Sequence, residues 1–133
     1  MAFRTRESLD TNVILRLMLA DMPEQCLQIQ DLLMRQGRMY SVADLAVTEA
    51  VYVLEANSTR EQIVEMLGSV LTLPNIKYNK TLFDGVFPMY LKHPKLSFND
   101  CCLAVYAELN EAEPLWTFDR ALAKQSGTAK LVV

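Results

Sequence analysis

Four acidic residues, each in or beside an apolar run, constrain this chain more than any other feature. Asp10 follows Leu9 and begins the sequence Asp-Thr-Asn, Glu49 lies in Val-Thr-Glu-Ala, Asp100 in Phe-Asn-Asp and Asp119 in Thr-Phe-Asp-Arg. An unpaired carboxylate is costly to bury, so four such acids from four segments predict one convergent acidic site. Clusters of acidic oxygens hold hard divalent cations. The pattern therefore favours a metal-dependent hydrolase that acts on phosphodiesters.

Helix capping is a competing explanation for three of these acids. Asp10 is followed by Thr11 and Asn12, and all three residue types are favoured at helix N-caps. Ser97-x-x-Asp100 resembles a capping box, although Glu or Gln is the usual fourth member, and Asp119 precedes a predicted helix. Caps explain each aspartate separately. Only a shared cation also explains Glu49, which lies inside an apolar helical stretch, so both explanations stay open.

Composition and cysteine usage set the broad class of the protein. The chain has 133 residues, without a repeat or a Pro/Gly/Ser-rich linker, so we expect one domain over residues 1–133. Arg16 and Asp21 interrupt the most apolar early stretch, which argues against a membrane span. Residues 1–8 contain no apolar signal core, so we expect no secretion. Three cysteines, an odd number without Cys-x-x-Cys spacing, favour a reducing cytoplasm.

Charge and missing motifs narrow the chemistry. The formal charge of −3 argues weakly against nucleic acid, but with four acids committed to metal the rest of the chain carries +1, so net charge decides nothing. His93 lies between lysine and proline, in an expected solvated loop. Because it is the single histidine of the chain, zinc sites built on several imidazoles are excluded. The four glycines are isolated, so neither a P-loop nor a dinucleotide fingerprint is present.

Short strands alternate with helices in the predicted secondary structure. The expected strands are residues 7–9, 39–42, 75–78, 115–117 and 130–133, and the expected helices are 11–20, 23–36, 43–57, 58–71, 81–91, 98–110 and 119–125. Ser58 and Glu61 form a capping-box pattern, and Gly85 and Pro88 are expected to interrupt their helix. This alternation predicts a mostly parallel sheet covered on both faces. In such sheets ligands bind beyond the carboxyl ends of the strands, where Asp10 and Asp119 fall.

The sequences LDTNVILRLML, AVTEAVYVLE, SFNDCCLAVYAE and PLWTFDRAL together resemble a PIN-domain ribonuclease of the VapC toxin type. The resemblance covers nearly the whole chain and implies a three-layer α/β/α fold with a short, mostly parallel central sheet. It implies that Asp10, Glu49, Asp100 and Asp119 are the acidic quartet that holds Mg²⁺ or Mn²⁺, and that Asn12 and Thr117 orient the acids or the attacking water. Family members often have a further Asp where this chain has Ser97, so the resemblance does not extend to a full second metal site.

The resemblance implies an endoribonuclease that is the toxin of a toxin–antitoxin pair, with RNA as its substrate. Arg120, Lys92 and Lys95 are candidate phosphate contacts. The alternative is a catalytically silent PIN-fold module that binds RNA or protein. A third hypothesis is a phosphatase of small substrates, but it would need an Asp-x-Asp motif, and Asp-Thr-Asn lacks the second acid. We also expect a homodimer and an antitoxin partner. Met22, Leu32 or Met34 would line an exposed groove for it, whereas the competing expectation is that methionines 18, 34, 66 and 89 fill the core.

Overall fold

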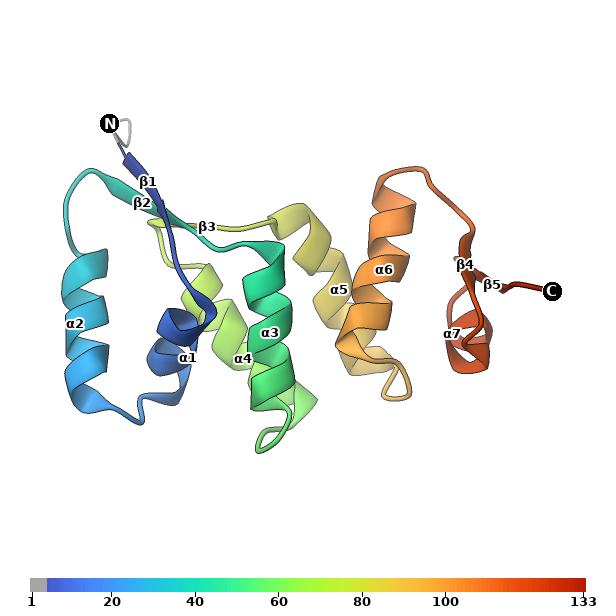
Figure 1. The fold of residues 1–133 in the computed structure, drawn as a ribbon, viewed down its shortest axis with the longest axis horizontal. Coiled ribbons are helices and arrows are strands. Elements are labelled where there is room, and N and C mark those ends of the chain that lie inside the picture. Colours follow the sequence, from blue (N-terminus) through green and yellow to red (C-terminus); the bar gives the residue numbers. More distant parts are fainter. Residues whose placement is uncertain (1–4) are drawn as a thin grey trace. The chain divides into compact units, whose positions relative to one another are not determined.

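Helices and strands alternate along residues 5–133, the part of the chain that the computed structural model describes (Figure 1). The elements are, in order, β1 (Thr5–Ser8), α1 (Thr11–Leu19), α2 (Pro23–Leu33), β2 (Arg38–Ser41), α3 (Asp44–Leu54), α4 (Arg60–Leu71), β3 (Ile76–Lys77), α5 (Lys80–Lys92), α6 (Phe98–Leu109), β4 (Leu115–Thr117), α7 (Arg120–Gln125) and β5 (Ala129–Leu131). They form two compact units, Met1–Asn79 and Lys80–Val133. That residues 1–133 are one domain stays a prediction. Half of the N-terminal segment expected to lack a signal core, residues 1–4, lies outside the described residues.

The first unit is built on three parallel strands in the order β1-β2-β3. Glu7 pairs with Tyr40 in β2, and Tyr40 pairs with Ile76 in β3. The pairing continues past β1, because the Leu9 amide donates to the Ser41 carbonyl at 3.0 Å. Each connection consists of two helices, α1 and α2 between β1 and β2, then α3 and α4 between β2 and β3. The predicted parallel pairing is therefore confirmed in this unit, and it fixes the place where Asp10 leaves the sheet.

The helices of the first unit bury their apolar faces against one another. Helix α1 contacts both α3 and α4, and the buried positions of α3 and α4 recur at intervals of three or four residues, which puts them on one face. The most deeply buried aliphatic side chains on these helices are Ile14, Val47, Val51, Ile63, Leu67 and Leu71. This core holds the start of α1 and the middle of α3 in fixed relative positions.

Helix α2 is attached to the sheet by its C-terminal end. The Tyr40 hydroxyl donates to the Leu32 carbonyl at 2.7 Å, and the Asn75 side-chain amide donates to the Leu33 carbonyl at 2.6 Å. These two side chains satisfy carbonyls that a helix end leaves without an intrahelical partner. Pro23 opens the helix, as predicted, but the helix ends at Leu33 rather than at Gln36. The sequence pattern missed this end because both stabilising side chains lie outside the helix, eight and 42 residues further along the chain.

Helix α4 begins with a capping box one residue later than predicted. The Thr59 hydroxyl accepts a hydrogen bond from the Gln62 amide at 3.2 Å, and the Gln62 side-chain oxygen accepts one from the Thr59 amide at 2.9 Å. The predicted pair, Ser58 and Glu61, is wrong. The pattern Ser/Thr-x-x-Glu/Gln occurs here in two overlapping frames, and residue type alone does not separate them.

Replacing Thr59 with alanine should lower the free energy of unfolding by about 1 kcal/mol, because the cap of α4 is lost. Ser58→Ala is the matched control and should change stability by less than about 0.5 kcal/mol. Urea denaturation of the two variants measures both values. A larger loss in Ser58→Ala than in Thr59→Ala would contradict the observed frame.

The second unit begins with the helical hairpin of α5 and α6. Aromatic rings of both helices pack together, with Phe83 and Phe98 stacked at 6.1 Å between ring centroids and Tyr90 edge-on to Phe98 at 5.1 Å. Helix α5 runs without a break through Gly85 and Pro88, so the predicted interruption is wrong. A Cβ atom built on Gly85 would lie 2.8 Å from Cγ1 of Val105 in α6. Gly85 is therefore a point of close helix packing.

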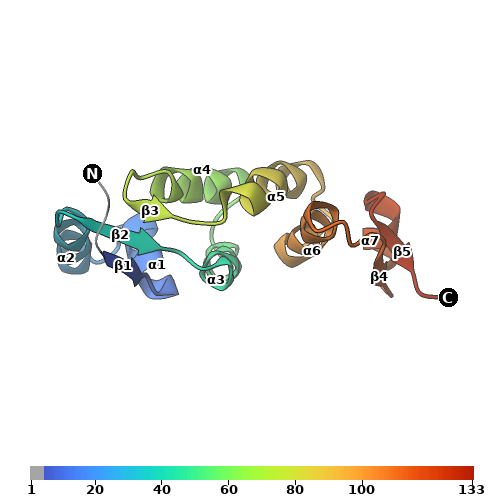
Figure 2. The same ribbon diagram turned by 90° about the horizontal axis from the view of Figure 1, so that it is seen from above.

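Strands β4 and β5 form a parallel pair beside α7 (Figure 2). Leu115 pairs with Ala129, Trp116 with Lys130 and Thr117 with Leu131. The Val132 amide also donates to the Thr117 carbonyl at 2.9 Å. The chain is thus held in the sheet up to Thr117, and Asp119 follows two residues later at the start of α7.

Candidate active site

Asp10 and Glu49 lie close to each other in the first unit, linked through Thr11. Asp10 is the N-cap of α1, and its Oδ1 accepts a hydrogen bond from the Thr11 amide at 2.7 Å. The Thr11 hydroxyl donates to Oε1 of Glu49 at 3.4 Å. Asp10, Glu49 and Asn12 are all exposed. The start of α1 and the middle of α3 therefore present two exposed carboxylates that are linked through Thr11.

Asp100 and Asp119 begin the last two helices of the second unit. Ser97 and Asp100 form a capping box, in which Oδ2 of Asp100 accepts from the Ser97 amide at 3.2 Å and the Ser97 hydroxyl accepts from the Asp100 amide at 3.0 Å. Oδ1 of Asp119 accepts from the Leu122 amide at 3.1 Å, and the Thr117 hydroxyl accepts from the Asp119 amide at 2.9 Å. Thr117 thus orients the backbone that carries Asp119.

The capping explanation is confirmed for all three aspartates, and it leaves room for a second role. In each of Asp10, Asp100 and Asp119, one of the two carboxylate oxygens accepts a capping hydrogen bond from a backbone amide within residues 5–133. A carboxylate has about four acceptor positions on its two oxygens, so a cap uses only part of this capacity. Glu49 caps no helix. It lies exposed in the second turn of α3, where the cap explanation does not apply.

Each unit contributes two of the four predicted ligands. Within the described part of the chain, no three His, Cys, Asp or Glu side chains of either unit are grouped so that they could hold a metal ion. The ligand set that the sequence predicts is therefore Asp10 and Glu49 from one unit and Asp100 and Asp119 from the other.

The basic candidates are solvent-facing, whereas the single histidine is not. Lys92, Lys95 and Arg120 are exposed, and Arg120 directly follows Asp119 as the first residue of α7. His93 is half-buried, with its Nδ1 atom 3.2 Å from Oε1 of Gln125. His93 therefore lies in a loop, as expected, but the expectation that it is solvated is wrong, because its ring contacts Gln125 of α7.

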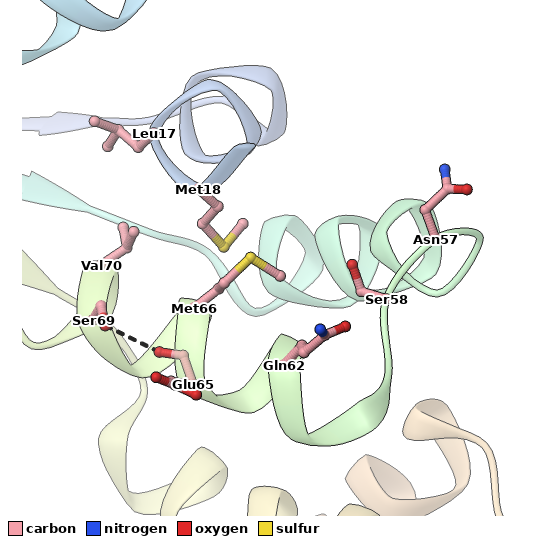
Figure 3. Close-up of a pocket in the computed structure, with 9 residues that line it drawn as sticks. All are labelled: Leu17, Met18, Asn57, Ser58, Gln62, Glu65, Met66, Ser69 and Val70. Carbon is pink, nitrogen blue, oxygen red and sulfur yellow. Dashed lines mark hydrogen bonds between the residues drawn. The ribbon is translucent and has the colours of Figure 1, made fainter. Parts of the chain in front are cut away.

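A cavity that sequence reasoning did not locate lies between α1 and α4 of the first unit (Figure 3). It has a volume of about 560 Å³, with Met18, Met66 and Val70 as apolar lining and Gln62, Glu65 and Ser69 as polar lining. We call it the α1–α4 cavity. Figure 3 shows the sulfur atoms of Met18 and Met66 facing each other across it. In the sequence, Met18 and Met66 were the residues that could have indicated this cavity.

A second hollow of about 440 Å³ adjoins the α1–α4 cavity and shares Leu17, Ser69 and Val70 with it. Met34 lines this hollow and is 82% exposed, so the expectation that Met34 fills the core is wrong. Met22 is also exposed and lines a separate surface hollow with Pro23 and its neighbours, whereas Leu32 is half-buried. Of the three residues expected to line a groove, Met34 lines the hollow that adjoins the α1–α4 cavity.

Comparison with known proteins identifies the family. No helix within residues 5–133 has both the length and the apolar character needed to cross a membrane. No curated protein matches the chain. The family model of the PIN domain matches residues 8–127, a range that includes all four predicted acids. Together with the alternating helices and parallel strands, this match confirms the predicted PIN-like α/β fold class. The chain therefore belongs to the PIN domain family.

Proposed function

We propose that this protein is a Mg²⁺- or Mn²⁺-dependent endoribonuclease whose metal ligands are Asp10, Glu49, Asp100 and Asp119. The observation that carries the proposal is the Thr11–Glu49 hydrogen bond. It links an exposed glutamate in the middle of a helix to the cap of another helix, where Asp10 already presents a carboxylate. Capping requires only Asp10, whereas a cation requires both acids.

The chemistry of the donor set fits a hard divalent cation. PIN domains have a nuclease-type fold, PIN nucleases typically use divalent metals, and all four proposed ligands offer carboxylate oxygen, the donor that Mg²⁺ and Mn²⁺ prefer. A bound cation supplies charge stabilisation at the scissile phosphate and lowers the pKa of a bound water. Asn12, exposed beside Asp10, would orient the attacking water, and Thr117 would hold Asp119 in place through its amide.

Three exposed basic side chains would bind the RNA backbone. Arg120 is exposed and adjacent to Asp119, and Lys92 and Lys95 are exposed around the end of α5. Lysine and arginine contacts to phosphate position a nucleic acid without reading its sequence. We assign these three residues to substrate binding, with Arg120 as the main candidate because of its place in the chain.

A catalytically silent PIN-fold module is the alternative. Such a module would bind RNA or protein with the same fold but would not need clustered carboxylates, which repel one another in the absence of metal. Incubating the protein with RNA, single-stranded DNA and a small phosphate ester, with and without Mn²⁺, separates the proposed activity from this alternative and from a phosphatase. Metal-dependent cleavage of RNA alone supports the proposal.

We further propose that the protein acts in the cytoplasm as a homodimeric toxin and that an antitoxin occupies the α1–α4 cavity and the adjoining hollow. The combined lining of methionine, leucine and valine suits the apolar face of an amphipathic helix, and Glu65 would attract a basic residue at its edge. A basic side chain of this partner could also reach Asp10 or Asp119 and displace the metal. A small open reading frame directly upstream of the gene would support this assignment.

Metal binding should raise the melting temperature of the protein by several degrees. A cation that binds only the folded site at about a hundred times its Kd stabilises the fold by about 2.7 kcal/mol. The shift should shrink in Glu49→Gln and Asp100→Asn, which remove ligand charge from each unit. Glu61→Gln, an exposed acid in the first turn of α4, is the control. Differential scanning fluorimetry with Mn²⁺ measures the shifts, and equal shifts in all four proteins would place the metal elsewhere.

A further inference from the structure

Two large aromatic side chains are exposed immediately before Asp119. Trp116 in β4 is 60% exposed and Phe118, at the end of the strand, is 82% exposed. In the same unit Phe83, Tyr90 and Phe98 are buried in the α5–α6 hairpin, whereas Tyr106 on α6 is also exposed. Trp116 and Phe118 differ from Tyr106 in their place, because they flank Thr117, the residue whose hydroxyl holds the Asp119 amide.

The segment that carries these rings has a net positive charge, unlike the rest of the chain. Lys130 in β5 is the register partner of Trp116 and is exposed. Residues 115–133 contain three basic residues and one acid, a net charge of +2, so residues 1–114 carry −5 of the formal total of −3. Exposed aromatic rings together with basic side chains are the combination that single-stranded nucleic acids require, because bases stack on the rings while the cations bind phosphates.

We infer that Trp116 and Phe118 form a stacking platform for unpaired bases of an RNA substrate, with Lys130 binding an adjacent phosphate. The inference rests on the proposed function and deepens it by assigning the side chains that would hold unpaired bases of the substrate beside Asp119. Paired bases in an A-form helix are already stacked and offer no free face, whereas splayed bases in loops do. The platform adjoins Asp119, so the stacked nucleotide lies next to a proposed metal ligand.

Binding of RNA to full-length protein tests this platform. The probes are a fluorescein-labelled 12-nucleotide single-stranded RNA and the corresponding 12-base-pair RNA duplex, with Ca²⁺ in place of Mn²⁺, and the measurement is fluorescence anisotropy. Phe118→Ala and Phe118→Leu should both weaken single-strand binding by about tenfold, while Phe118→Trp should bind like the wild type. Tyr106→Ala is the control, because Tyr106 is an exposed aromatic residue on α6 and should leave affinity unchanged.

Trp116 supplies a second, independent measurement, because it is the single tryptophan of the chain. Stacking with a base should quench its intrinsic fluorescence as single-stranded RNA is added, and the duplex should produce much less quenching. Lys130→Ala should weaken single-strand binding and reduce its salt dependence by about one unit of the logarithmic slope. These readouts do not require cleavage.

The outcomes separate this inference from the proposed function. Wild-type affinity in Phe118→Leu would show that apolar area rather than stacking matters, and would overturn the platform. Equal binding of single strand and duplex would do the same. If light scattering shows that Phe118→Ala changes a dimer to a monomer with RNA affinity intact, the rings form a protein interface instead. Mn²⁺-dependent cleavage by the wild type in any of these cases leaves the proposed function standing, whereas a wild type that neither binds nor cleaves RNA removes both.

Discussion

The Asp10→Asn protein is expected to cleave RNA about a hundredfold more slowly than the wild type, or slower still, with its fold intact. Loss of residues that merely support metal ligands already costs about 10–100-fold, and Asp10 is proposed to be a ligand itself. Asparagine keeps the shape of the side chain and is as good an N-cap as aspartate. Its side-chain oxygen can still accept the hydrogen bond from the Thr11 amide.

Cleavage rates with Mn²⁺, together with circular dichroism melting curves, check this expectation. The variant should melt at or above the wild-type temperature in metal-free buffer, because one of the clustered negative charges is gone. Asp31→Asn is the matched control, since Asp31 is an exposed aspartate on α2 and should cleave normally. Cleavage by Asp10→Asn at the wild-type rate would contradict the assignment of Asp10 as a metal ligand.

Replacing Gly85 with leucine should be the most damaging single change to the fold among those considered. The Cβ atom alone would lie 2.8 Å from Cγ1 of Val105, a distance at which either the valine side chain or the helices must shift. Overpacking of a core costs about 1–3 kcal/mol, and a leucine adds three further carbons. The gain of up to about 1 kcal/mol from removing a helical glycine offsets only part of this cost. We expect a net loss of about 2 kcal/mol.

Chemical denaturation measures this loss, and two further proteins show its cause. Gly68→Ala should be neutral or stabilising, because a Cβ atom at Gly68 meets nothing within 4 Å. In the double variant Gly85→Leu/Val105→Ala, part of the loss should be recovered, since the valine methyl group that causes the clash is absent. A Gly85→Leu protein as stable as the wild type would show that α5 and α6 do not approach this closely.

Local sequence signals predicted the start of most elements and the capping roles of the acids. Asp10 and Asp119 precede helices and cap them in the structure, and Asp100 completes the capping box that begins at Ser97, because capping depends on residues three or fewer positions apart. Strand β4 has the predicted limits. The errors arise where distant residues decide the outcome. Val105 explains why Gly85 does not break α5, and Gln125 explains why His93 is half-buried.

The candidate site shows the same division between local and long-range information. The identity of the four acids came from short motifs, but the Thr11–Glu49 hydrogen bond spans 38 residues and no local pattern contains it. The α1–α4 cavity likewise depends on how two helices pack. The exposure of Trp116 and Phe118 was also not predicted, since apolar residues near a short strand are more often buried.

The attachment of α2 has a consequence for its local stability. The side chains of Tyr40 in β2 and Asn75 just before β3 hold its last turn, whereas Met22 gives its first turn no side-chain cap and the Cys26 thiol donates one weak hydrogen bond to the Arg16 carbonyl. Ile29 is its single buried residue among those described. We therefore expect amide hydrogen exchange in α2 to slow toward Leu33. Leu33 and Met34, which line the hollow next to the α1–α4 cavity, belong to the ordered end. A partner that binds there meets a preorganised surface and loses little free energy in ordering it.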